Sequence, residues 1–151
     1  MPILVILILL MMSGCSKQSD YEIVSANFET RNDAAVAFYK NNMPVIESLN
    51  DEQELLGYVI QCGERYYHTN WRIGGVKNKM SLDVAQGTGC STKAIVHTHP
   101  VSKGIYLDFF SRDDMKTGEL IPTYLFSLHK NVVRVTDEAN SKFAGRVITI
   151  I

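Results

Sequence analysis

Two histidines and one aspartate carry the strongest chemical signal in this sequence. His97 and His99 lie two residues apart in the stretch His97-Thr98-His99-Pro100. Because side chains alternate between the two faces of a β-strand, both imidazoles would point to the same side of an extended segment. Asp114, on the helix expected to follow, would add a carboxylate and complete three protein ligands for one metal ion. Zinc fits such a set, and its fourth coordination position would stay open to water.

Glu54 is the candidate for the base that would take a proton from that water. It lies far upstream, in Glu54-Leu55-Leu56-Gly57. Each signal also has a purely structural interpretation. A His-x-His pair can be polar strand surface, Glu54 belongs to the acidic run 51–54, and Ser111 with Asp114 forms a helix capping box. The signals together, in this order and on suitable elements, favour a metal site.

The combined pattern resembles the signature of the JAMM (MPN+) metallopeptidases: a Glu before an apolar strand with Gly, then His-x-His-Pro, then Ser-x-x-Asp. The resemblance covers roughly residues 32–136. It extends to a poorly characterised bacterial branch of such domains, often found at the C-termini of Rhs-type toxins. Features shared with that branch include an Ala-Ala helix (here Ala34-Ala35), a Tyr-rich second strand and Phe-Ser before the Asp (here Phe110-Ser111).

The resemblance implies a role for each residue. His97, His99 and Asp114 would hold zinc, Glu54 would be the general acid/base, and Ser111 would help to stabilise the tetrahedral intermediate. The implied fold is α/β, a single JAMM-like (cytidine-deaminase-like) domain with a mixed β-sheet flanked by helices. The implied activity is that of a zinc-dependent peptidase or isopeptidase. Because JAMM-like domains also occur as metal-free scaffolds, the alternative is a non-catalytic envelope lipoprotein, a binding or scaffold module tied to a toxin or secretion system.

The N-terminus predicts a bacterial lipoprotein. Residues 1–12 form an uncharged apolar run that suits the core of a signal peptide and is short for a membrane-spanning helix. The run ends in Met12-Ser13-Gly14-Cys15, which resembles a lipobox, so residues 1–14 would be removed and Cys15 lipidated. An uncleaved N-terminal anchor is the alternative. Residues 15–27 would tether the domain, residues 28–151, to the cell envelope.

The residue after the lipidated cysteine bears on localisation. It is Ser16, not Asp. In a Gram-negative cell, such a lipoprotein would be sorted to the outer membrane and face the periplasm. The expected partners are then the membrane, through the N-terminal lipid, and a peptide or peptidoglycan-like amide substrate.

Cysteine usage fits an oxidising compartment. With Cys15 lipidated, Cys62 and Cys90 remain as an even pair. Cys62 ends one expected strand, and Cys90 precedes the strand with the two histidines. The pair is either a disulfide that braces these strands or two buried free thiols, and the sequence leaves both open.

The charge balance argues against one class of partner. The chain has 151 residues, with 15 basic and 16 acidic side chains and a net charge of −1. Such a balance creates no strong field for nucleic acid. With 46% hydrophobic residues, the chain is long enough to form one compact domain. Nothing in the sequence predicts an oligomeric state.

The remaining pattern predicts the elements that must position the site. Asn32-Asp33 would cap a helix running to about Asn42, and Pro44 would end it or begin a short turn. Residues 73–89 and 101–110 are expected loops, the first with some extended structure around 80–84, and residues 111–119 a short helix. The expected strands are 55–61, 65–71, 92–99, 123–128, 132–136 and 146–151, with a hairpin turn at 62–64. Along the central strand, Ile95, His97 and His99 would share one face, and Ala94, Val96 and Thr98 the other.

Overall fold

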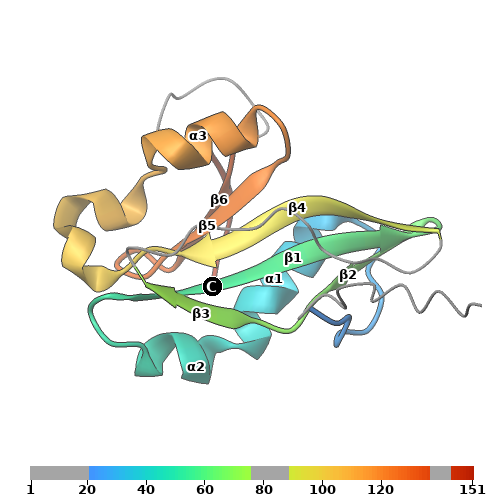
Figure 1. The fold of residues 1–151 in the computed structure, drawn as a ribbon, viewed down its shortest axis with the longest axis horizontal. Coiled ribbons are helices and arrows are strands. Elements are labelled where there is room, and N and C mark those ends of the chain that lie inside the picture. Colours follow the sequence, from blue (N-terminus) through green and yellow to red (C-terminus); the bar gives the residue numbers. More distant parts are fainter. Residues whose placement is uncertain (1–20, 76–88, 137–143) are drawn as a thin grey trace, which may run out of the picture.

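A curled, mixed β-sheet with helices on both faces forms the fold (Figure 1). The computed structural model describes residues 21–75, 89–136 and 144–151. In chain order the elements are α1 (Arg31–Asn41), α2 (Met43–Ser48), β1 (Gln53–Cys62), β2 (Arg65–His68), β3 (Arg72–Gly75), β4 (Cys90–Thr98), the 3-10 element η1 (Val101–Asp108), α3 (Arg112–Gly118), β5 (Thr123–Ser127), β6 (Val132–Val135) and β7 (Arg146–Ile150). The expected α/β class with a mixed sheet is therefore confirmed.

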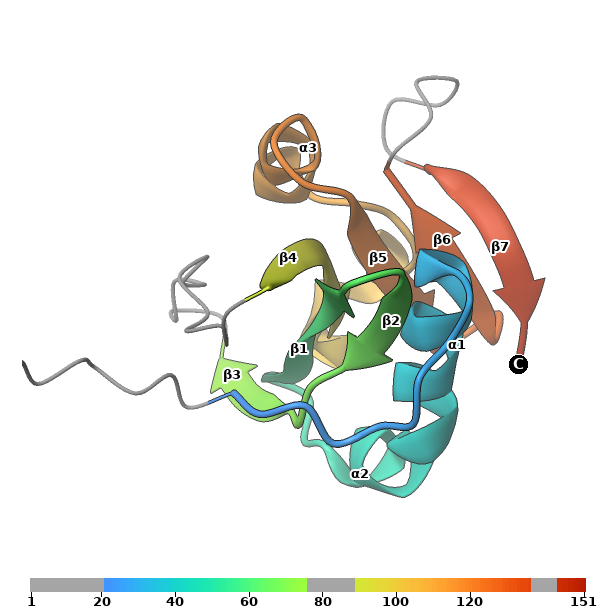
Figure 2. The ribbon, with the colours of Figure 1, turned by 90° about the vertical axis from the view of Figure 1, so that its right-hand side faces the viewer.

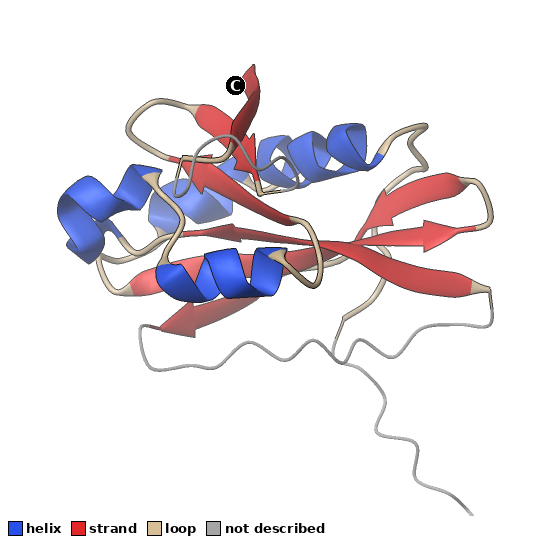
Figure 3. Cartoon of the chain, turned by 90° about the horizontal axis from the view of Figure 1, so that it is seen from above, coloured by secondary structure: helices blue, strands red, loops and turns tan. Residues whose placement is uncertain are grey.

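The described strands follow the order β2-β1-β4-β5-β6-β7, and β3 also pairs with β1. Strand β4 is central: it runs antiparallel to β1 and parallel to β5. Figure 2 shows the sheet curling around α1, with β2 on one side of the helix and β7 on the other. Figure 3 gives the same arrangement from above, with the strands in red. In the part of the chain that the structure describes, no helix has the length and apolar character needed to cross a membrane.

Helix α1 begins earlier than the sequence predicts. The N-cap is Thr30: its backbone is extended, and its hydroxyl oxygen accepts a hydrogen bond from the Asp33 amide at 3.1 Å. The prediction of a cap at Asn32-Asp33 was therefore wrong. Asp33 lies inside the first turn, where its carboxylate accepts from the Thr30 hydroxyl at 2.7 Å and faces the positive end of the helix. Pro44 lies at the start of α2, a position where its missing N–H costs no hydrogen bond.

Strand β3 was not expected. The return strand was predicted over residues 65–71, but the observed strand, β2, already ends at His68. The chain then pairs with β1 a second time, as β3, where the sequence predicted the start of a loop. Strand β1 is 10 residues long, so β2 occupies one half of its edge and β3 the other. The Gly74-Gly75 pair at the end of β3 has the composition of a loop, which explains the error. The predicted extended structure around residues 80–84 lies outside the described residues.

The two faces of β4 meet different clusters, as its alternation predicts. Ala94 and Val96 pack in the main core with Leu55 and Val59 of β1, on the side covered by α1. Ile95 packs in a second cluster on the opposite face. Both faces of the strand are therefore buried, and the side that carries Ile95 continues towards the two histidines.

One glycine fixes how closely α1 approaches the sheet. A Cβ atom at Gly57 of β1 would overlap the ring of Phe38, which is fully buried in α1. Only a residue without a side chain fits at this position, because a packed core cannot shift to admit even one methyl group at no cost. Gly57 is the glycine of the Glu54-Leu55-Leu56-Gly57 stretch, so the same segment sets the helix–sheet packing and carries the candidate base.

Candidate metal centre

Strand β4 delivers both histidines to the face of the sheet that α3 covers. His97 lies within the strand, and His99 follows its last residue, just before Pro100, which has no N–H to continue the ladder. Their rings meet at 3.2 Å between the two Nε2 atoms, and each residue is at most 3% exposed. Two buried imidazoles that face one another are not polar strand surface, which was the structural alternative for this pair.

Asp114 reaches the same point from α3. Its Oδ2 is 2.9 Å from His99 Nε2, and its Oδ1 is 3.2 Å from His97 Nε2. Oδ2 also accepts the backbone N–H of Ser111 at 2.6 Å, and the Asp114 amide donates to the Ser111 hydroxyl at 3.1 Å. The capping box and the candidate ligand set are therefore one arrangement: the cap fixes the carboxylate that faces the histidines.

The spacing of the three side chains fits a metal ion. Ligand atoms of His97, His99 and Asp114 all lie within 4.8 Å of one another. In a tetrahedral zinc site with bonds of about 2.05 Å, two ligand atoms are about 3.3 Å apart. The observed separations of 3.2, 3.2 and 2.9 Å are close to that value. This buried cluster can hold a metal ion, and its nitrogen and oxygen donors are of the kind that zinc accepts.

Backbone contacts orient the His97 ring for this role. Its Nδ1 lies 2.8 Å from the carbonyl oxygen of Tyr124 in β5. A carbonyl oxygen only accepts, so Nδ1 must carry the proton, and the lone pair of Nε2 then points at the other two side chains. This is the usual outer contact of a metal-binding histidine, and it fixes both the tautomer and the ring plane.

The charges of the cluster are strongly coupled in the metal-free chain. Burial alone would lower the pKa of His97, but the Asp114 carboxylate, with smaller contributions from Glu54 and the Tyr124 carbonyl, raises it overall. Burial would likewise raise the pKa of Asp114, yet the two histidines hold it well below its usual range. A carboxylate that stays ionised while buried is ready to bind a cation.

Glu54 lies on the same face of the sheet as the histidines. Strand β1 pairs with β4 so that Leu56 is opposite His97, and residues opposite each other in an antiparallel pair share a face. Glu54 is two residues before Leu56, so its side chain points to the same side. A Cβ atom added at Gly74 of β3 would be 3.5 Å from Glu54 Oε1, which shows that the carboxylate lies over that glycine.

The position of Glu54 suits a base better than a fourth ligand. Its charge contributes to the raised pKa of His97, but its oxygens are not part of the group within 4.8 Å. The segment is held in place because the amide of Leu55 donates to the Thr98 hydroxyl of β4 at 2.9 Å. A carboxylate near the cluster, yet outside it, can reach a water or substrate group bound at the centre.

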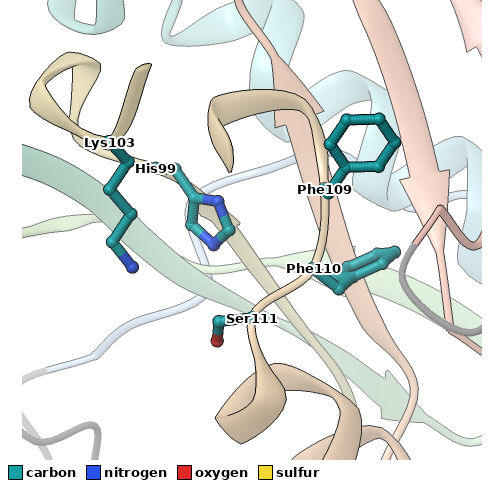
Figure 4. Close-up of a pocket in the computed structure, with 5 residues that line it drawn as sticks. All are labelled: His99, Lys103, Phe109, Phe110 and Ser111. Carbon is teal, nitrogen blue, oxygen red and sulfur yellow. The ribbon is translucent and has the colours of Figure 1, made fainter. Parts of the chain in front are cut away.

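A cavity of about 260 Å³ opens beside the cluster (Figure 4). Its walls are His99, Lys103 of η1, Phe109, Phe110 and Ser111. Figure 4 shows the Lys103 side chain running past the His99 ring, and the Ser111 hydroxyl on the same side as the lysine ammonium. The cavity is therefore lined by one candidate ligand, one hydroxyl and one cation, with the Phe109 and Phe110 rings together on the other side of His99 from Lys103 (Figure 4).

The sequence left two alternatives open for Cys62 and Cys90, a disulfide or two free thiols. The structure contains the disulfide. These residues are directly opposite in the β1–β4 register, with Cα atoms 4.1 Å apart. The disulfide therefore joins the strand that carries Glu54 to the strand that carries the histidines. The predicted lipidation site, Cys15, lies outside the described residues.

Two residues at the centre escaped the sequence analysis. Lys103 was assigned to a loop, although it is the only basic residue between Pro100 and Ser111, and that isolation was the available signal. Tyr39 is a buried residue of α1, and its hydroxyl contacts the His97 backbone. No local pattern in the sequence reports such a contact between segments 58 residues apart.

Comparison with known proteins assigns no relative to this fold or to this cluster of side chains. No family model, no curated protein and no solved structure matches the chain.

Proposed function

We propose that this chain is a zinc-dependent peptidase or isopeptidase with a JAMM-like (cytidine-deaminase-like) domain, held in a bacterial cell envelope by a lipid on Cys15. One observation carries the proposal: a buried His97, His99 and Asp114 cluster has a separate carboxylate, Glu54, on the same face of the sheet. Three ligands with an open fourth position and a nearby carboxylate are the minimum for metal-assisted hydrolysis of an amide. A structural zinc site would instead be closed by a fourth protein ligand.

The residues divide the proposed reaction among them. Zinc, when bound, would polarise the amide carbonyl and lower the pKa of water from about 15.7 towards about 7. Glu54 takes the proton of the attacking water and later passes it to the leaving amine. Ser111 donates its hydroxyl hydrogen to the oxygen that develops negative charge. That hydrogen is available, because the Ser111 oxygen is the acceptor in its contact with the Asp114 amide.

The proposed location narrows the substrate. In the periplasm, the side-chain amide cross-links of peptidoglycan stem peptides are isopeptide bonds of the kind expected from the resemblance, and envelope proteins are a second source of amides. Anchoring at Cys15 is tested by expressing the chain and a Cys15→Ser variant with labelled fatty acid. We expect label on the first and none on the second, and label on both would contradict lipidation at this cysteine.

The metal site is tested by measuring zinc bound to the purified protein and to two variants of α3. Asp114→Ala removes a candidate ligand, whereas Asp113→Ala removes an exposed carboxylate from the same helical turn. We expect about one zinc per chain in the parent and in Asp113→Ala, and a large loss in Asp114→Ala. Equal zinc content in both variants would contradict the site.

Catalysis is tested separately with Glu54→Gln, and Glu52→Gln serves as the control because Glu52 is exposed in the turn before β1. Release of new amines from muropeptides is the assay. Glu54→Gln should keep its zinc and lose turnover, and Glu52→Gln should keep both. Full activity in Glu54→Gln would mean that another group is the base. Zinc binding by the parent without cleavage of any amide substrate would favour the non-catalytic binding module.

A further inference from the structure

The cavity beside the cluster contains a lysine that the proposed chemistry does not use. Lys103 is half-buried and lines the cavity together with His99 and Ser111. Within the described ranges, no acidic side chain forms an ion pair with it. An ammonium group at a cavity wall, without an anionic partner of the protein, is available to pair with the negative charge of a ligand.

The backbone around Lys103 is fixed rather than free to swing away. The Ser102 amide donates to the Asp51 carbonyl at 2.8 Å, and the Lys103 amide donates to the Pro100 carbonyl at 3.0 Å. Gly104 follows with φ of +57°, a conformation that favours glycine and turns the chain sharply after the lysine. The lysine is therefore presented to the cavity by a loop that is tied down on its N-terminal side.

The other end of η1 is anchored as well. Asp108 is buried, and its carboxylate accepts a hydrogen bond from the Ser127 hydroxyl at the end of β5. The ammonium of Lys130, in the hairpin between β5 and β6, lies 3.7 Å from the same carboxylate. Lys130 thus already has an anionic partner, which distinguishes it from Lys103.

The charges of the site point to an anionic ligand at Lys103. With a divalent cation bound, the carboxylates of Asp114 and Glu54 would balance its two positive charges. Among the described residues that line the cavity, the Lys103 ammonium would then be the charge without a counterion. Phe109 and Phe110 add apolar surface to the lining of the cavity, and its volume of about 260 Å³ limits the size of the ligand.

We propose that Lys103 is a specificity-determining residue that binds a free carboxylate on the substrate residue next to the scissile amide. This inference rests on the proposed function and names its substrate class: peptides in which a free carboxylate, at a C-terminus or on a diamino acid, lies beside the bond to be cut. An ammonium group is a compact point charge that can pair with one carboxylate oxygen without demanding a fixed fork geometry.

The test measures binding rather than turnover. Two dipeptide-like hydroxamates, which bind a metal ion without being cleaved, are compared on the zinc-loaded protein by calorimetry: one ends in a free carboxylate and the other in the matching carboxamide. A charge-assisted hydrogen bond in a partly desolvated site should favour the carboxylate by at least about 10-fold in Kd. Lys103→Met should abolish this preference, so that the two compounds bind the variant with equal Kd.

Two further variants serve as controls. Lys103→Arg keeps the charge and should keep most of the preference, and Lys116→Met removes an exposed lysine of α3 outside the cavity and should change nothing. Equal binding of the two hydroxamates to the parent, an unchanged preference in Lys103→Met, or binding of neither compound to a zinc-loaded protein would overturn the role of Lys103 and leave the metal site standing. Absence of zinc from the parent would overturn the proposed function, and this inference with it.

Discussion

The hydroxyl of Tyr39 bridges the backbone of His97: it donates to the His97 carbonyl oxygen and accepts the His97 amide, each at 3.1 Å. Tyr39 reaches this point from α1, which covers the face of the sheet opposite to the metal cluster. Burial raises the pKa of Tyr39 well above its ordinary value, so the hydroxyl keeps its proton and remains a donor. The helix that packs the core therefore also fixes the strand that presents the ligands.

Tyr39→Phe should weaken both folding and metal binding. It removes two buried hydrogen bonds to the His97 backbone, and we expect a loss of about 1–3 kcal/mol in the free energy of unfolding. Because the ligand strand is then less well fixed, zinc affinity should fall as well. Chemical denaturation and zinc titration measure the two effects.

Tyr124→Phe is the matched control. The Tyr124 hydroxyl contacts Arg31 and Asn32 at the start of α1, while His97 is held by the Tyr124 backbone carbonyl, which the substitution keeps. This variant should lose stability and keep its zinc affinity. If both variants changed zinc affinity equally, Tyr39 would act only through general stability.

The three side chains of the candidate metal site could be predicted to lie together because their positions follow from local rules. The period of two along a strand places His97 and His99 on one face whatever the rest of the fold does. The capping box orients Asp114 within a single turn of helix. Local rules do not place Glu54 near the histidines. Its position relative to them depends on the register between β1 and β4, which cannot be read directly from the sequence.

The parts that sequence reasoning missed depend on contacts between distant segments. The N-cap is Thr30 rather than Asn32 or Asp33, although all three residue types are good caps. The geometry of the chain where it enters α1 selects among them. Strand β3 formed from a glycine-rich segment because β1 offers it an unpaired edge. The position of Lys103 beside the cavity depends on the contact between the Ser102 amide and the Asp51 carbonyl, which joins distant segments and leaves no local signal at the lysine.

Substitutions at Ser111 can separate its structural role from its proposed chemical one. Ser111→Ala removes the cap and should cost about 0.5–2 kcal/mol of stability, whereas Ser111→Gly should cost only a few tenths. Both variants keep the backbone N–H that holds Asp114, so both should retain zinc. Both also lack the hydroxyl, and turnover should fall about 100–1,000-fold in each.

Ser111→Thr completes the series, because it restores a hydroxyl at the cap. It should recover stability and a substantial part of the rate. The informative comparison is Ser111→Gly against the parent in the amide assay. Equal rates for these two proteins would reduce Ser111 to a helix cap.

Removal of the Cys62–Cys90 disulfide should destabilise the domain without dismantling the metal centre. The bond closes a segment with a sequence separation of 28, for which the chain-entropy estimate is roughly 3.5 kcal/mol at 25 °C. The two strands stay paired through their backbone ladder from Leu56 to Gln61, so the register near the cluster does not depend on the bond.

The double variant Cys62→Ser/Cys90→Ser tests this separation. Its unfolding free energy should drop by about that amount, and its zinc content should match the parent at temperatures where it is folded. Thermal unfolding and metal analysis on the same samples measure both. Loss of zinc from a variant that is still folded would show that the disulfide itself positions the two histidines.

His68 predicts a pH dependence that does not involve the metal centre. It is buried at the end of β2, where its Nδ1 lies 3.0 Å from the Thr69 carbonyl and its Nε2 lies 3.0 Å from the Asn41 amide nitrogen. The neutral ring satisfies both contacts, with Nδ1 donating and Nε2 accepting. Burial lowers the pKa of His68, and the contact to the Thr69 carbonyl offsets only part of that effect.

The sign of the effect follows from this lowered pKa. Between the pKa of the unfolded chain, about 6.5, and the lower pKa of the folded chain, the unfolded state binds more protons. The contribution of His68 to stability is therefore complete above about pH 6.5 and is lost as the pH falls, with a slope of at most about 1.4 kcal/mol per pH unit.

His68→Gln should remove that slope, while His129→Gln, at a histidine whose side chain is 58% exposed, should preserve it. The free energy of unfolding of the metal-free proteins is measured with denaturant between pH 7.5 and pH 5. Subtracting the value of each variant from that of the parent isolates the contribution of the substituted histidine, because the titration of His97 with Asp114 is common to all the proteins and cancels. A difference between parent and His68→Gln that stayed constant across this range would mean that His68 accepts a proton as readily folded as unfolded. In that case the Asn41 amide must turn its oxygen towards the ring, because only an acceptor at that place can satisfy a protonated Nε2.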